Sequence, residues 1–324
     1  MKTKTVLFSL IYVMVFLLTS CEEDDIPENV KPGGTTFIAG YSIAKESILR
    51  SIPVEFIEKA RQTLHIAYQH TSHGTHVSYG LFGLQDYKDG DDILFGITNN
   101  HPTDNKLDFH DYALASYAEA GEDASDLSRN ETAFIQATRN YLDDDKNAAT
   151  NVIMWSWCDI AGHDVDVNYL PGMQTLIDEY GVDGSKIGTG SGQRENYVHF
   201  IFMTGHANRN NNIGNKKPHD QAKLITDFCK KNKLFCLDYY SIDTHDMDDN
   251  YWEDAGDDGN SDSYGGRFYQ DYQDAHSIGD GYYENKKSPG GSATYGAHNT
   301  QHITANRKAY AMWWILARLS GWNS

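Results

Sequence analysis

The sequence predicts an α/β fold: a three-layer sandwich built on a doubly wound, mainly parallel sheet. Apolar runs of strand length alternate along the chain with segments of helical periodicity. In such sheets the working residues lie on loops beyond the carboxyl ends of the strands. Four polar loops follow predicted strands, and they begin after Gln69, Trp157, Met203 and Ile242.

The predicted strands are short and bounded by polar or turn-forming residues. Residues 151–157, "NVIMWSW", form a continuous apolar run, as expected of a buried parallel strand. The other predicted strands are residues 63–69, 197–205 and 234–242.

The predicted helices carry apolar residues at helical spacing. Residues 51–62 begin with Ser51 as an N-cap candidate and Pro53 in the first turn. Residues 173–181 end at Gly181, a candidate C-terminal cap. Further helices are predicted over residues 131–145, 219–232 and 303–322, the last of them long and amphipathic.

One segment, residues 243–297, breaks this alternation. It is rich in Asp, Gly and Tyr, with almost no aliphatic residues. A loop of this length inside a domain is expected to be functional or ion-bound, so we interpret it as an insertion across the active-site edge. Its aromatic residues suit contact with sugars, and equally suit a small core for the loop itself.

The N-terminus has the layout of an export signal: two lysines, an apolar run from Val6 to Leu18, then small residues. The run is shorter than the roughly 20 residues of a membrane span. "LTSC", ending at Cys21, resembles the lipobox of bacterial lipoproteins, which implies cleavage before Cys21 and its acylation. The acidic "EEDDIPE" that follows resembles the surface-export signal of Bacteroidetes lipoproteins, which implies the outer membrane and the cell surface.

The expected organisation is a signal peptide over residues 1–20, a lipid-anchored tether over 21–40, and one domain over 41–324. The formal charge of −19 excludes nucleic acid as a partner and leaves the lipid as the expected membrane contact. Cys229 and Cys236 flank a predicted helix-to-strand turn and are candidates for a disulfide bond, whose geometry only a structure can supply.

The segment "HIAYQHTSHGTHVSYGL", residues 65–81, places three histidines around Ser72 at the end of a predicted strand. Three interpretations compete: a metal cage, a nucleophile turn, or hydrogen-bonded scaffolding. A serine nucleophile needs a neighbouring base and donors aimed at the oxyanion, and a strand-to-helix turn supplies exposure and a helix N-terminus. The candidate bases in "HNTQHITANRKA" are His298 and His302.

Two metal hypotheses also follow from the residues. His70, His73 and His76 could hold zinc together with a carboxylate, although no H-E-x-x-H or CxxC pair is present. "DAGDDGNSD" partly resembles a calcium loop and offers Asp254, Asp258 and Asp262 as structural calcium ligands.

The order of elements and polar segments resembles the SGNH (GDSL-like) hydrolases over residues 60–320. Ser72 stands where the family serine ends the first strand, and Gly121 stands in the second block, "DFHDYALASYAEAGEDASDL". "NVIMWSWCD" corresponds to the third block, and "HITANRKAYA" to the fifth, with His302 as the base.

Three departures from the family pattern matter. The first block reads His70-Thr71-Ser72 instead of Gly-Asp-Ser, and Cys158 replaces the third block's asparagine, for which Asn208 is an alternative. Asn299 stands where the family has an aspartate, so three alternatives remain: a Ser-His dyad, an aspartate from elsewhere, or His298 as the base.

The resemblance implies ester hydrolysis on extracellular carbohydrate, for example deacetylation, with no required cofactor. Ser72 would attack and His302 or His298 would act as base. The oxyanion candidates are Gly121, Asn208 and Cys158, and the supporting residues are His70, His73 and His206. The alternatives are a catalytically silent glycan-binding lipoprotein and a zinc-dependent hydrolase.

Overall fold

The fold is α/β, with a six-stranded, entirely parallel central sheet, consistent with a doubly wound arrangement. The computed structural model describes residues 36–323, so the predicted signal peptide and Cys21 lie outside the described residues. The strands run in the spatial order β1-β6-β5-β4-β2-β3. They are β1 (Ile38–Ala39), β2 (His65–Gln69), β3 (Asp108–Asp111), β4 (Val152–Trp155), β5 (His199–Met203) and β6 (Cys236–Leu237).

The strand order reverses beside β2. Ile66 of β2 is in register with Phe109 of β3 on one side and with Val152 of β4 on the other. The chain therefore moves outward in one direction to β3 and in the other through β4, β5 and β6. Open α/β sheets bind ligands at the carboxyl ends of the strands where this reversal occurs. Ser72 follows β2 at this switch point.

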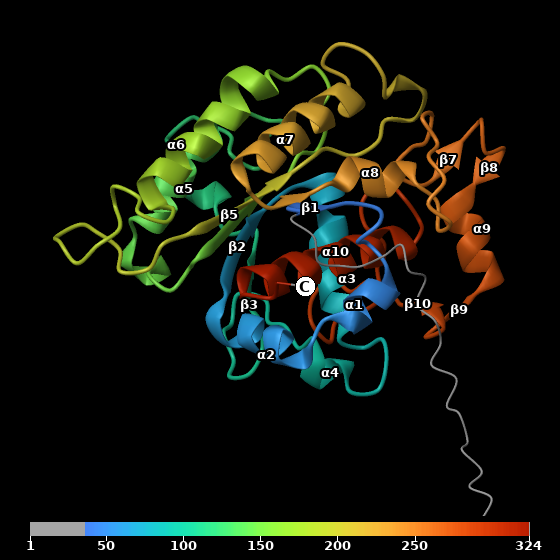
Figure 1. The fold of residues 1–324 in the computed structure, drawn as a ribbon, viewed down its shortest axis with the longest axis horizontal. Helices are drawn as coiled ribbons and strands as arrows, with labels where there is room; N and C mark the ends of the chain where they lie inside the picture. The colour runs from blue at the N-terminus through green and yellow to red at the C-terminus, as the bar shows by residue number, and fades with distance from the viewer. Residues whose placement is uncertain (1–35, 324) are drawn as a thin grey trace, which may run out of the picture. The chain divides into compact units, whose positions relative to one another are not determined.

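Helices cover both faces of the sheet (Figure 1). Helices α5, α6 and α7 lie on one face, and α1, α2, α3 and α10 lie on the other. The bounds of the ten α-helices within residues 36–323 are α1 (Glu46–Ser51), α2 (Val54–Thr63), α3 (Thr75–Leu84), α4 (Asp91–Leu94), α5 (Ala133–Leu142), α6 (Leu170–Tyr180), α7 (Pro218–Asn232), α8 (Tyr239–Thr244), α9 (Phe268–Ala275) and α10 (Ile303–Leu319).

Helix α10 is buried on every side, whereas the sequence predicted an amphipathic helix. All residues from Ile303 to Ala317 are buried, and α10 packs most extensively against α3. Gly80 of α3 faces the carbonyl of Ala305, where any Cβ would clash, so the glycine allows the two helices to approach closely. This packing carries the charged Lys308 of α10 into the interior.

Several predicted boundaries differ from the structure. The strand expected over 234–242 stops at Leu237, because the Asp238 side chain accepts a hydrogen bond from the Ser241 amide and caps α8. Ser51 ends α1 instead of capping α2, and its hydroxyl donates to the Ile48 carbonyl. Strand β1 lies inside the segment expected to be tether. The predicted cap at Gly181 is confirmed, and this glycine ends α6 in an extended conformation.

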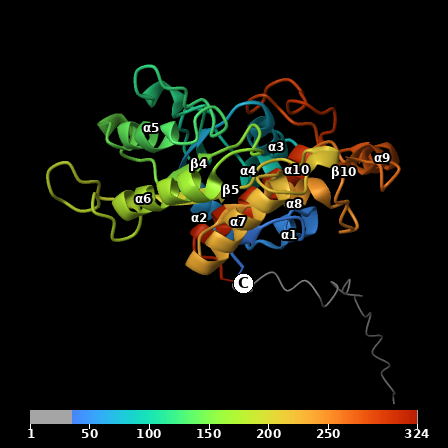
Figure 2. The ribbon, with the colours of Figure 1, turned by 90° about the horizontal axis from the view of Figure 1, so that it is seen from above.

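The insertion, residues 243–297, is ordered around its own small core. Its short strands pair as β7 (Asn260–Ser261) with β8 (Gly266–Arg267) and as β9 (Ser277–Ile278) with β10 (Gly281–Tyr282). Figure 2 shows α9 and β10 together at one end of the domain. Aromatic residues therefore form a local core, as one of the two interpretations expected. The buried members of this core are Ala255, Phe268, Tyr269 and Tyr282, with Ile303 of α10 packed among them.

The disulfide considered between Cys229 and Cys236 is not formed: both thiols are free and buried, and Cys158 is also free. Burial, followed by the hydrogen bond with Cys229, raises the pKa of the Cys236 thiol. Over residues 36–323, no helix has both the length and the apolar character needed to span a membrane.

Candidate functional site

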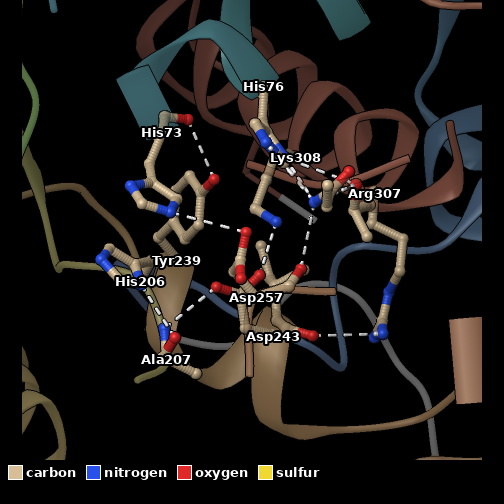
Figure 3. Close-up of polar contacts among 12 residues, drawn as sticks. His73, His76, His206, Ala207, Tyr239, Asp243, Asp257, Arg307 and Lys308 are labelled. Carbon is tan, nitrogen blue, oxygen red and sulfur yellow. Dashed lines mark hydrogen bonds and ion pairs between the residues drawn. The ribbon is translucent and has the colours of Figure 1, made fainter. Parts of the chain in front are cut away.

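Loops at the carboxyl edge of the sheet bring titratable side chains into one largely buried group, which we call the histidine cluster (Figure 3). The loop after β2 supplies His73, and the loop after β5 supplies His206. Further members come from α3, α8, the insertion, the segment before α10, and α10 itself. The cluster comprises His73, His76, His206, Asp243, Asp257, His298 and Lys308.

Three imidazole rings form a stack inside the cluster. The His73 ring centroid lies 3.6 Å from that of His206 and 4.4 Å from that of His298, with interplanar angles of 14° and 22°. His73 and His206 are buried, and His298 is exposed, so the stack reaches from the interior to the surface. Burial, and then the neighbouring His298, lowers the pKa of His73 to about 4, so its ring is neutral at pH 7. Burial and His73 likewise lower the pKa of His206.

Carbonyl contacts determine which ring nitrogens carry protons. His206 Nδ1 lies 2.8 Å from the Ala207 carbonyl, and His76 Nε2 lies 2.8 Å from the Ala297 carbonyl. A carbonyl only accepts, so each of these nitrogens donates, and the opposite nitrogen of each neutral ring holds a lone pair. His73 Nδ1 is buried without a hydrogen-bond partner among residues 36–323.

A fully buried ion pair supports the stack. Lys308 Nζ lies 2.6 Å from Asp243 Oδ1, and neither side chain is exposed to solvent. The Ala207 amide donates to the same carboxylate at 3.1 Å, so the pair joins α10 to the loop that carries His206. Burial raises the pKa of Asp243 to about 6 while Lys308 opposes the rise, and burial lowers the pKa of Lys308.

Ser72 occupies a strained turn directly before the stack. Its φ of +36° lies in the left-handed region, which residues other than glycine rarely adopt. The Thr75 hydroxyl donates to the Ser72 carbonyl at 2.7 Å, and a Cβ at Gly74 would clash with His70 and Ser156. Backbone strain of this kind concentrates at functional sites, because the surrounding structure must hold it in place.

The structure separates the two candidate bases. His302 Nδ1 accepts a hydrogen bond from the Asn285 amide at 3.2 Å, and its ring stacks on Tyr295. That hydrogen bond uses the lone pair of Nδ1 and leaves the proton of the neutral ring on Nε2. His298 instead stacks on His73, the residue after Ser72. Within residues 36–323, the Ser72 hydroxyl makes no hydrogen bond to either ring.

The trio His70, His73 and His76 does not form a cage. His70 Nε2 bonds Asp111 Oδ1 at 2.8 Å in a buried pair, and His76 bonds the Ala297 carbonyl, so only His73 joins the stack. In the part of the chain that the structure describes, no three His, Cys, Asp or Glu residues are arranged to hold a metal ion.

The proposed calcium ligands also face different partners. Asp254 accepts from the Ser261 hydroxyl, Asp258 from the Asn260 amide, and Asp262 from Arg209 and Asn210.

The three oxyanion candidates have surroundings that do not include the Ser72 hydroxyl as a hydrogen-bond partner within residues 36–323. Gly121 sits in an exposed turn with φ of +91°. The Cys158 amide donates to Ser128 Oγ at 2.8 Å, and the Asn208 amide donates to Asn212 Oδ1. None of the three has a hydrogen bond to Ser72 among the described residues.

Sequence reasoning missed the three charged members of the cluster, Asp243, Asp257 and Lys308. Asp243 directly follows a predicted strand, which was a usable signal, and Lys308 lies within an apolar helix pattern. Asp257 is one of many aspartates in the insertion, so composition could not single it out.

Comparison with known proteins gives no match to a protein-family model, to a curated protein or to a solved structure. The fold and the site define the protein as an α/β protein with a strained serine turn and a histidine cluster at its switch point.

Proposed function

We propose that the protein is a serine hydrolase that cleaves esters, with Ser72 as the nucleophile and His298 as the base. The observation that carries this proposal is the placement of a strained serine at the switch point, directly before the His73–His298 stack. The strand order of the sheet supports the resemblance to SGNH hydrolases, which share this type of scaffold.

In the proposed reaction, His298 takes the hydroxyl proton of Ser72 as Oγ attacks the ester carbonyl carbon. The backbone amides of Ser72 and His73 begin a short helix, and within residues 36–323 neither has a backbone hydrogen bond outside that helix. We assign these two amides as the donors to the developing oxyanion. The imidazolium returns the proton to the leaving alcohol, and water then hydrolyses the acyl-enzyme by the reverse sequence.

We further propose that the substrate is an ester, such as an acetyl group, on extracellular carbohydrate, and that Cys21 anchors the protein to the outer membrane. The lipobox-like N-terminus supports the location. Tyr251 and Tyr295 are 45% and 46% exposed, which supports contact with flat polar ligands such as sugars. Loss of the protein from intact cells on proteinase treatment tests the surface placement.

The decisive experiment compares p-nitrophenyl acetate and acetylated-oligosaccharide hydrolysis by wild type, Ser72→Ala, His298→Gln and His302→Gln. We expect Ser72→Ala and His298→Gln each to lose roughly 10²-fold or more in kcat, because each removes a group that acts in the transition state. His302→Gln is the matched control and keeps its activity. An equal rate for Ser72→Ala and wild type would remove the assignment.

A catalytically silent glycan-binding protein is the second candidate, favoured by the missing hydrogen bond between the Ser72 hydroxyl and a histidine. A fluorophosphonate probe separates the two candidates, because it labels an activated serine and leaves a turn serine unmodified.

A further inference from the structure

We propose that Asp257, carried by the insertion, is a positioning residue whose carboxylate stabilises the protonated form of the His73–His298 stack. Its catalytic consequence rests on the proposed function, but its electrostatic effect on the histidines does not. The insertion would then supply the carboxylate that is absent at Asn299.

The contact geometry places this carboxylate beside His73, the central ring of the stack. Asp257 Oδ2 lies 3.5 Å from His73 Nε2, and the two side chains are only 17% and 10% exposed (Figure 3). The same oxygen is buried and has no hydrogen bond within residues 36–323. A buried carboxylate oxygen without a donor is costly unless a nearby positive charge compensates for it. A proton on the stack would provide that charge.

Charged and titratable groups around the stack act on its protonation in opposite directions. Burial and, less strongly, the neighbouring Asp258 carboxylate raise the pKa of Asp257, while His206, Lys308 and His298 lower it, so the carboxylate interacts with both outer rings. The other titratable and charged groups that face His73 are His76 and Lys308, which oppose its protonation, and Asp159, which favours it. Lys308 already has its own carboxylate partner in Asp243.

Hydrogen bonds hold the Asp257 backbone in this place. Asn299 Nδ2 donates to the Asp257 carbonyl at 3.3 Å, and Gly256 forms an antiparallel bridge with Asn208. Asn212 Nδ2 donates to the Ala255 carbonyl at 2.8 Å. The asparagine at position 299, where the family resemblance leads us to expect an aspartate, thus holds the loop that presents a different aspartate.

The chemical role follows from the sign of the charges. When His298 takes the serine proton, the stack acquires a positive charge, and its central ring lies beside the Asp257 carboxylate. A fixed negative charge nearby stabilises that imidazolium and makes the imidazole a stronger base. Replacing Asp257 by an isosteric neutral residue should therefore lower the pKa of the stack.

The test compares Asp257→Asn with Asp258→Asn in the full domain. Asp258 is a matched control, because it is the adjacent carboxylate but accepts from the Asn260 amide and faces Arg267. Histidine Cε1–H resonances are followed by NMR between pH 4 and 9, and His298→Gln and His73→Gln variants assign them. We expect Asp257→Asn to lower the titration midpoint of the stack by about one pH unit, as for loss of a nearby opposite charge. Asp258→Asn should leave it in place.

Asp257→Glu keeps the charge and should retain the wild-type midpoint. It is the second variant for the test if Asp257→Asn folds poorly. Unchanged histidine midpoints in Asp257→Asn, or an equal shift in Asp258→Asn, would overturn the proposal. In the hydrolysis assay, the acidic limb of the pH–rate profile should move to lower pH and kcat should fall. Full activity of Ser72→Ala would reject the proposed function alone, because the NMR midpoints measure the carboxylate's effect without catalysis.

Discussion

Removing Lys308 should destabilise the protein in a strongly pH-dependent way. Lys308→Met keeps most of the side-chain length but leaves the Asp243 carboxylate fully buried without its cation. The Ala207 amide remains as a donor to that carboxylate. One amide does not replace the interaction of a full charge at 2.6 Å, so the carboxylate becomes an uncompensated buried charge.

The magnitude follows from burial. Exposed ion pairs contribute about 0–1 kcal/mol to the free energy of unfolding, whereas removal of one partner of a buried pair costs about 3–5 kcal/mol. At about 2–4 °C per kcal/mol for a chain of this size, the melting temperature should fall by roughly 6–20 °C at pH 8.

The sign of the pH effect is set by Asp243. Its pKa is already raised to about 6 by burial, and it should rise further once Lys308 no longer opposes the burial effect. A carboxyl whose folded pKa exceeds its unfolded pKa loses stability as pH rises between the two values. Folding with Asp243 protonated costs about 1.4 kcal/mol per pH unit above an unfolded pKa of about 3.9, hence about 1.5 kcal/mol at pH 5.

Urea unfolding followed by tryptophan fluorescence at pH 5 and pH 8 measures this difference. We expect Lys308→Met to lose about 2–3 kcal/mol more at pH 8 than at pH 5. Lys308→Met combined with Asp243→Asn removes both charges and should recover most of the loss. Lys223→Met, in an ion pair whose side chains are 66% and 52% exposed, is the surface control. A loss of the same size at both pH values, or one as small as the control's, would refute the reasoning.

Two further predictions concern strain and charge. Ser72→Gly should be about 1 kcal/mol more stable than Ser72→Ala in urea, because glycine accepts the positive φ that alanine resists; equal midpoints would contradict the strained turn. Although burial raises the pKa of Asp108, hydrogen bonds from His110 and His65 lower it to about 2. Asp108→Asn should therefore cost about 1–2 kcal/mol at pH 6, and the deficit should shrink as pH falls from 4 towards 2; a deficit that grew on acidification would have the wrong sign.

Local patterning predicted much of the framework. The strand runs at 63–69, 151–157 and 197–205 contain β2, β4 and β5, and the predicted helix over 131–145 contains α5. The predicted helices over 173–181 and 219–232 overlap α6 and α7, which begin three residues and one residue earlier. This agreement has a local cause, since apolar periodicity within a segment determines how that segment can bury its face. The rule that polar loops follow strand ends also led to His73 and His206, which the structure brings together.

Prediction failed where a segment's structure depends on distant partners. The strand expected through residue 242 gives way to α8 because of a cap. Helix α10 is buried all round because α1, α2, α3 and the sheet surround it, with α3 approaching closely at Gly80. Periodicity within α10 contains no information about its neighbours, so the buried Lys308 could not be foreseen without Asp243.

The sequence by itself determined the α/β class, the acidic insertion and the serine turn, because these depend on composition and on neighbours a few residues away. Only the tertiary structure decided that His298 rather than His302 stacks beside that turn, and that Asp257 reaches His73. These choices are made by loop closure and burial between segments that are distant in the chain. A difference of a few ångströms in where a loop docks changes the partner of a side chain without changing any local sequence pattern.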